Sequence, residues 1–262
     1  MNLKNSIKQA TQGTVLYSPL RDSYQCLFNH RRWRYRKERV AFYSQFVSKD
    51  DLVFDIGANA GDYTQLFVDL GARVVAVEPN VKLVELLKKV RPFDLVAVEG
   101  VALGSKEGSA NMYVCDHDYL ASLSDEWIAV AGRSKRFSGI EWHRTTVVPV
   151  STLDALIKRF GAPQFIKIDV EGFEREVLKG LSTPPKFLSF EFNSEFAEAA
   201  AACLQLDCFP PQAGFNLVED LSLRFMFDHW VSRDEVLRLL EGREFAKNTT
   251  YGDIFVCLRN SS

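Results

Sequence analysis

Residues 52–70 read LVFDIGANAGDYTQLFVDL, and this stretch is the clearest indication of the fold class. Its first three residues are apolar, as in a buried strand, and apolar side chains from Tyr63 to Leu70 recur on one face of a helix. Between them, Gly57 and Gly61 allow the backbone to turn sharply and to pass close to a ligand. The stretch therefore predicts a strand, a glycine loop and a helix of an open α/β sheet, in which ligands bind beyond the carboxyl ends of the strands.

The same alternation of short apolar runs and helical patterns continues along the chain. It predicts strands at 73–77, 94–98, 109–115, 145–150, 164–168, 187–192, 215–218 and 253–258, and helices at 81–90, 153–160, 173–181 and 194–206. This order is typical of a mostly parallel sheet with right-handed crossovers. We expect a helical extension over 1–50 that covers the opening of the ligand site at this edge of the sheet, and one domain over 51–262. Residues 116–144 read as a long irregular loop of the functional kind.

A carboxylate at the end of the next strand completes a candidate ligand site. Glu78 follows the glycine loop at a distance of about 20 residues, where a carboxylate accepts hydrogen bonds from both hydroxyls of a ribose. The order G-x-N-x-G lacks the third glycine of a pyrophosphate-binding loop, which favours a ligand without phosphate, such as S-adenosylmethionine. We predict that this cofactor is bound by Asp55, Gly57, Asn59, Gly61 and Glu78. A tight turn followed by a surface glutamate is the alternative.

The segment after the third predicted strand reaches the same edge of the sheet. Residues 99–103 would then lie beside Glu78. We expect their backbone and the small side chain of Ala102 to line the adenine pocket.

A second polar cluster, FIKIDVEGFE at 165–174, supplies candidate catalytic groups. Lys167 and Asp169 point to one side of a strand, and Asp169 falls at its carboxyl end. We predict that Asp169 orients or deprotonates a hydroxyl group of the substrate and that Glu171 supports Asp169. His143 is the reserve candidate for the base. Glu171 also suits the first turn of a helix, Lys167 could simply pair with a neighbouring carboxylate, and His143 could be a solvated loop residue.

With the glycine loop, Glu78 and the cluster at 165–174 taken together, the chain resembles the FkbM-type family of S-adenosylmethionine-dependent methyltransferases. The resemblance covers roughly residues 50–195, and its most specific part is the K-I-D-V-E-G cluster at 167–172. It implies a Rossmann-like class I methyltransferase fold, with a mostly parallel seven-stranded sheet and helices on both faces. It also implies methyl transfer, commonly to a hydroxyl of a sugar, polyketide or other natural product. The matching segments are 54–61, 76–79, 101–104, 151–154, 166–174 and 178–180.

Charge and composition limit the classes of molecule that this protein is expected to bind. The formal net charge of −2 gives no general attraction to nucleic acid or membrane, and no apolar run approaches the roughly 20 residues of a membrane span. We therefore expect a cytoplasmic enzyme with a small hydroxylated substrate; the sequence predicts no oligomeric state.

The basic segment 31–39 could contact RNA, although a solvated helix face explains it better. Asp169, Glu191 and Asn193 offer oxygen ligands for Mg²⁺, but the preferred interpretation has no metal.

Three other functions remain open at this stage. An RNA or protein methyltransferase would need a large cationic face and would lose affinity with added salt. A binding protein without catalysis would hold S-adenosylmethionine and never turn it over. An NAD-dependent oxidoreductase is disfavoured by the glycine spacing.

Overall fold

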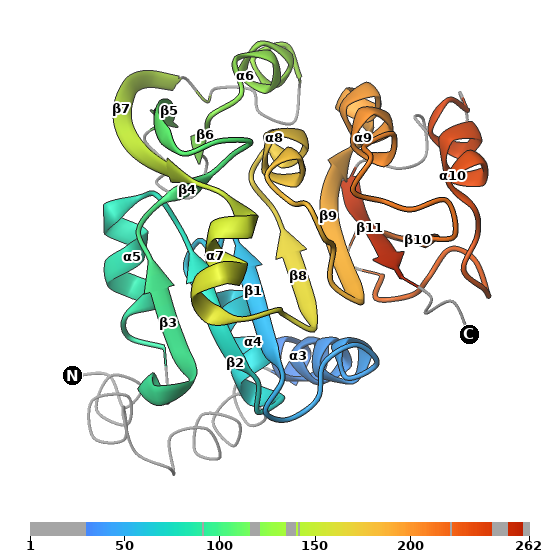
Figure 1. The fold of residues 1–262 in the computed structure, drawn as a ribbon, viewed down its shortest axis with the longest axis horizontal. Coiled ribbons are helices and arrows are strands. Elements are labelled where there is room, and N and C mark those ends of the chain that lie inside the picture. The colour runs from blue at the N-terminus through green and yellow to red at the C-terminus, as the bar shows by residue number, and fades with distance from the viewer. Residues whose placement is uncertain are drawn as a thin grey trace.

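The computed structural model describes residues 30–90, 92–115, 121–134, 140, 142–220, 222–242 and 251–258, without the side chains of 30–33, 143 and 144. Its centre is a seven-stranded sheet with the order β10-β11-β9-β8-β1-β2-β3 (Figure 1). The strands are β1 (Leu52–Ile56), β2 (Arg73–Val77), β3 (Val96–Glu99), β8 (Phe165–Ile168), β9 (Phe187–Asn193), β10 (Gly214–Glu219) and β11 (Tyr251–Cys257).

Strand direction confirms the predicted mostly parallel sheet. The neighbours from β3 to β9 pair in parallel, whereas β11 pairs antiparallel with both β9 and β10. Because β8 pairs directly with β1, the end of the strand that carries Asp169 lies beside the glycine loop. This confirms the neighbour relationship that the usual strand order predicts.

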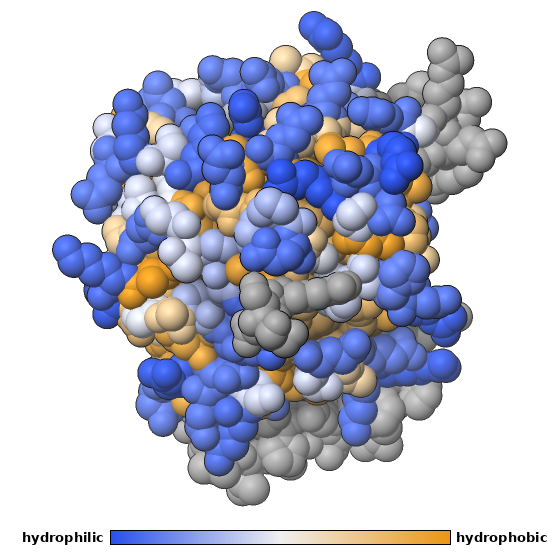
Figure 2. All heavy atoms as spheres, turned by 45° about the vertical axis from the view of Figure 1, so that its right-hand side comes forward, coloured by the Kyte–Doolittle hydropathy of each residue, from blue (hydrophilic) through white to orange (hydrophobic). Residues whose placement is uncertain are grey.

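Helices cover both faces of this sheet, as predicted. One face carries α3 (His30–Tyr43), α4 (Asp62–Asp69) and α5 (Val81–Leu87), and the other carries α7 (Leu153–Phe160), α8 (Glu174–Lys179), α9 (Ala197–Leu204) and α10 (Arg233–Leu240). Short 3-10 turns lie at Phe93–Leu95 and Ser194–Phe196. On the face that Figure 2 turns toward the viewer, hydrophilic residues are interspersed with smaller apolar areas, as on the surface of most folded proteins.

Helix α3 packs against the sheet through aromatic side chains. Phe42 and Tyr43 of α3, together with Phe46 just after it, lie against Phe165 of β8 and Phe255 of β11. Ring centroids are 5.3 Å apart for Phe46–Phe255, 5.5 Å for Phe42–Phe255 and 5.9 Å for Tyr43–Phe165. Burial of so much aromatic surface ties the helix firmly to the domain. The helix therefore lies on a sheet face; residues 1–29 of the predicted extension lie outside the described residues, and the boundary at residue 50 stays a prediction.

A second, four-stranded sheet lies beyond the carboxyl ends of the main strands, at the upper left of Figure 1. Its order is β4-β7-β5-β6, built from β4 (Ala102–Leu103), β5 (Gly108–Cys115), β6 (Ala121–Ser122) and β7 (Trp142–Ser151). The interpretation of 145–150 as part of the α/β rhythm was wrong, because these residues pair antiparallel with β5. The segment 116–144 is also more regular than predicted, since it contains β6, α6 (Asp125–Ala131) and the start of β7.

None of the helices in the described part of the chain has both the length and the apolar character needed to cross a bilayer.

Candidate active site

A cavity of about 370 Å³ opens between the carboxyl ends of the main strands and the small sheet. Its walls come from the glycine loop after β1, the end of β2, the segment 101–103 and the turn after β8. Met112 of β5, Leu123 just after β6 and Glu191 of β9 complete them. Of the predicted residues, Gly57, Asn59, Glu78, Ala102, Asp169 and Glu171 line it. The cavity therefore joins the predicted cofactor loop to the predicted catalytic cluster.

The glycine loop is locked against the backbone of Asp169. Gly57 has φ +77°, a left-handed conformation, and a Cβ atom built on it would lie 1.8 Å from the Asp169 carbonyl oxygen. The Asp169 N–H donates to the Ile56 carbonyl at 2.9 Å, and the Gly57 N–H donates to the Val77 carbonyl at 3.0 Å. Only glycine permits this approach, so the loop and the end of β8 form one rigid unit.

Glu78 is held by backbone donors on both carboxylate oxygens. Oε2 accepts from the Asn59 N–H at 3.0 Å and Oε1 accepts from the Asn80 N–H at 2.9 Å, while only 6% of the residue's surface is exposed. Burial raises the pKa of Glu78, and the two N–H groups oppose that rise. A carboxylate has about four acceptor sites, so both oxygens keep capacity for a ribose diol in the cavity. The residues present thus fit the nucleoside part of S-adenosylmethionine.

Asp55, at the end of β1, and Gly61, the last residue of the glycine loop, are not among the residues that line the cavity. Asp55 accepts a hydrogen bond from the Thr64 hydroxyl at 2.6 Å, and burial raises its pKa to about 6. Gly61 has φ +89° and precedes α4, where a Cβ would lie 3.0 Å from both Leu87 and Val90. This placement gives both residues a part in shaping the loop; their predicted contact with the cofactor stays a prediction.

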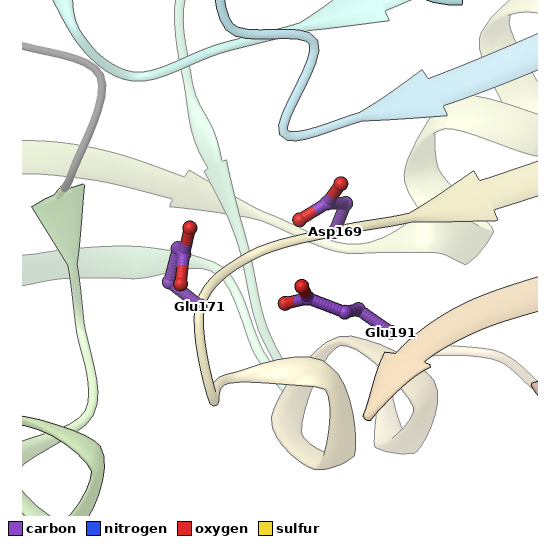
Figure 3. Close-up of side chains that lie close together, drawn as sticks. All are labelled: Asp169, Glu171 and Glu191. Atoms are coloured by element: carbon purple, nitrogen blue, oxygen red, sulfur yellow. The ribbon is translucent and has the colours of Figure 1, made fainter. Parts of the chain in front are cut away.

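Three carboxylates converge at the other end of the cavity (Figure 3). Asp169 and Glu171 come from the turn after β8, Glu191 comes from β9, and one oxygen of each lies within 4.8 Å of the others. Burial together with the charges of Asp169 and Glu171 raises the pKa of Glu191 well above its ordinary value. Such a trio can hold a proton or a hard cation. Asn193 donates to Glu191 at 3.4 Å, so it supports the trio from the side.

The small sheet and α6 fix the turn that carries Glu171. Glu171 has φ +52°, and its carbonyl accepts a hydrogen bond from the Ser122 hydroxyl at 2.6 Å. Gly172 has φ +88°, and a Cβ there would lie 2.4 Å from the Cβ of Trp127. A non-glycine residue in the left-handed region is strained, so these contacts hold Glu171 in place at the cavity.

Glu174, which follows this turn, gives a testable dependence of stability on pH. It accepts N–H groups of Val170 at 3.0 Å and Gly172 at 3.3 Å, and burial raises its pKa from 4.5 to about 7. Between these values the folded protein keeps the proton and the unfolded chain releases it, so the unfolding free energy falls as pH rises. Glu174→Gln should remove this loss, about 1–3 kcal/mol between pH 4.5 and 7.5 by urea unfolding. Parallel curves for the two proteins would contradict it.

Two further residues, His143 and Tyr63, differ in what the structure says of them. His143 belongs to β7, but its side chain lies outside the described residues. Its role as reserve base stays a prediction. Tyr63 of α4 lines the cavity although the sequence analysis placed it only on the packed face of its helix. Its position directly after the glycine loop was the available signal.

Comparison with known families now identifies the chain. Residues 55–221 match the family model described as the methyltransferase FkbM domain. The chain belongs to this family, and it is a methyltransferase that uses S-adenosylmethionine. A search of curated protein sequences finds no significant match.

Solved structures with a related arrangement include several methyltransferases. A precorrin-6y C5,15-methyltransferase from Geobacter metallireducens is 11% identical, with 84% of this chain and 88% of that chain covered and a TM-score of 0.41. A TehB-like methyltransferase from Corynebacterium glutamicum is 9% identical, with 92% and 100% covered and a TM-score of 0.41. An O-methyltransferase from Thermotoga maritima is 11% identical, with 86% and 67% covered and a TM-score of 0.39.

Truncation of Glu78 tests the cofactor site. Glu78→Ala leaves the ribose hydroxyls without their acceptor, which should cost roughly 1.5–3 kcal/mol of binding free energy for charge-assisted hydrogen bonds. Calorimetry with S-adenosylmethionine should show a dissociation constant raised roughly 10- to 100-fold. Glu85→Ala is the matched control, because Glu85 is an exposed glutamate of α5 that pairs with Lys88 at 2.7 Å. Equal losses in the two variants would contradict the assignment.

Proposed function

We propose that this methyltransferase methylates a hydroxyl group of a small molecule. The observation that carries the proposal is the carboxylate cluster beside the glycine loop. Asp169 and Glu171 line the cavity, and Glu191 completes the trio within 4.8 Å. Carboxylates can take the proton of a hydroxyl group, and they repel the phosphates of a nucleic acid. The cluster therefore favours a neutral or cationic acceptor over RNA.

The chemistry requires one proton acceptor and one positioned hydroxyl. The cofactor supplies an electrophilic methyl group on a sulfonium. With this cofactor bound, the acceptor oxygen would take the methyl group, the electron pair of the carbon–sulfur bond would remain on sulfur, and Asp169 would take the hydroxyl proton. Alignment of oxygen and methyl group supplies most of the acceleration, since near-attack geometry is worth about 7–11 kcal/mol. The base adds roughly 10²–10⁴-fold.

The basic segment of α3 gives little support to an RNA substrate. Arg36 forms an ion pair with Asp69 of α4, Arg34 pairs with Glu38, and the Arg39 guanidinium lies over the Tyr63 ring at 4.1 Å. Three of its arginines are thus engaged within the protein. This favours the solvated and packed helix face over a phosphate-binding surface.

An acceptor screen tests the proposal. The purified protein is incubated with S-adenosylmethionine bearing a trideuterated methyl group and with neutral sugars, sugar nucleotides, phenols or total RNA, and products are analysed by mass spectrometry. We expect labelling of a hydroxyl in one of the small-molecule classes. Efficient methylation of RNA at physiological salt would refute the proposal, and cofactor binding without any transfer would favour a binding protein. A parallel series with EDTA and added Mg²⁺ shows whether the carboxylates act through a metal.

A further inference from the structure

Among the described residues around the cavity, Lys167 carries the most heavily buried charge. Only 1% of its side chain is exposed, and its Nζ lies 2.7 Å from Oδ2 of Asp169 and 4.0 Å from Oδ1 of Asp253. It does not line the cavity. Burial of an ammonium is costly unless it is paired in good geometry, so the position needs an explanation beyond packing.

The surroundings of Lys167 compensate its charge. Burial acts to lower the pKa of the ammonium, but the carboxylates of Asp169 and Asp253 outweigh this and hold the pKa well above its ordinary value. The Nζ also lies 4.3 Å from the centroid of the Tyr63 ring, a cation–π contact. The lysine is therefore a permanent cation with two carboxylate partners.

The two carboxylates differ in their exposure to the cavity. Asp169 lines the cavity and is 34% exposed, whereas Asp253 of β11 is 17% exposed and is not a lining residue. The contact with Lys167 occupies Oδ2 of Asp169, and among the described residues Oδ1 has no hydrogen-bond donor. Lys167 thus fixes Asp169 through Oδ2 and leaves Oδ1 for the acceptor.

The support for Lys167 comes from both ends of the described chain. Asp253 lies on β11, and Arg39 of α3 covers the Tyr63 ring at 4.1 Å. Both residues fall outside the matched range 55–221. The family match alone therefore does not contain the whole arrangement.

We propose that Lys167 is a positioning residue that fixes the catalytic carboxylate of Asp169, and that Asp253, Tyr63 and Arg39 hold Lys167 for this task. The proposal rests on the proposed function, because it assigns Lys167 a role through the base of that reaction. Asp253 acts two contacts away from the acceptor, so its removal should slow turnover without weakening cofactor binding.

A double-mutant cycle with four proteins tests the proposal: wild type, Asp169→Asn, Asp253→Asn and the double variant. Urea unfolding should show that the double variant loses more stability than the sum of the single losses, because only then does the buried ammonium lose both counter-charges. Additive losses would show that the two carboxylates do not share Lys167, and would overturn the proposal.

Turnover of the same four proteins is measured on the best acceptor from the screen above. Asp253→Asn should reduce kcat by roughly 10- to 100-fold, as for a slightly displaced catalytic group, with the dissociation constant of S-adenosylmethionine changed less than about threefold. In the Asp169→Asn background the same substitution should cause no further loss. Asp207→Asn, at an exposed position, is the matched control and should leave both the unfolding free energy and kcat unchanged.

The outcomes separate the two proposals. Normal kcat in Asp253→Asn, or an equal loss in both backgrounds, would overturn the positioning role even if the urea cycle shows coupling. Normal turnover by Asp169→Asn, or no methylation by the wild type, would overturn the proposed function, while the urea cycle still reports whether the Lys167 network exists.

Discussion

Replacement of Asp169 by asparagine should reduce methyl transfer by roughly 10²-fold or more while S-adenosylmethionine still binds. Asparagine keeps the size of the side chain and its ability to accept a hydrogen bond, but it cannot take the acceptor proton. The carboxylate lines the cavity directly beside the glycine loop, and Lys167 holds one of its oxygens at 2.7 Å. Single-turnover rates and calorimetry on the same preparation measure the two effects separately.

The fold of this variant needs its own check, since Lys167 loses one of its two carboxylate partners. Urea unfolding should show a cooperative transition with a lowered midpoint. If Asp169→Asn turns over normally and resists chelator, Asp169 does not act in the chemistry and His143 becomes the candidate base. If chelator abolishes wild-type activity and Mg²⁺ restores it, the trio of carboxylates acts through a cation.

Gly57→Ala should have the largest effect on stability. The new methyl group would lie 1.8 Å from the Asp169 carbonyl oxygen, and the position requires φ +77°. The left-handed conformation alone costs alanine roughly 1–2 kcal/mol, and the clash forces the loop and the end of β8 apart. We expect a total loss of about 3 kcal/mol or more in unfolding free energy, measured in urea, together with loss of cofactor binding.

Gly100→Ala is the control for this substitution. Gly100 follows β3 at the same edge of the sheet, and within the described part of the chain a Cβ there meets Val84 alone, at 3.8 Å. The control should therefore unfold within about 0.5 kcal/mol of wild type. A mild effect of Gly57→Ala, similar to that of the control, would mean that the loop is not locked against Asp169.

The main sheet could be predicted because its strands are short, apolar and separated by clear helical patterns. The predictions for β2 and α7 match the observed bounds, and those for β1 and β9 fall short by one or two residues. The small sheet could not be placed, because the apolar pattern of 145–150 identifies a strand but does not say which sheet it joins. Pairing with β5 is a tertiary choice, made where β7 packs Val148 against Met112 and Ala102.

Two helices were missed although local signals were present. Ser124 caps α6 by accepting the Trp127 N–H at 3.1 Å, and Ser232 with Glu235 forms a capping box before α10. Both begin with acidic residues in the first turn, which is a recognisable start signal. Helix α10 also buries Val236 and Leu240, four residues apart, so its apolar periodicity was a further signal.

The site was predictable where residues fall at strand ends. Gly57, Glu78 and Asp169 meet there because the carboxyl ends of parallel strands share one edge. Arg39 and Asp253 could not be found in this way, since they approach from α3 and from the antiparallel β11. Their partners depend on how distant segments pack, which no local pattern records.

The position of β11 has a consequence for biosynthesis. This strand lies between β9 and β10 and pairs with both, although it follows them in the sequence. While the ribosome is still making residues 220–250, β9 and β10 have unpaired edges, and open edges recruit other chains. Asp253 arrives with β11, so the nascent chain also lacks the second counter-charge of Lys167 until then. A product truncated before residue 251 should consequently aggregate and be degraded, instead of persisting as a smaller enzyme.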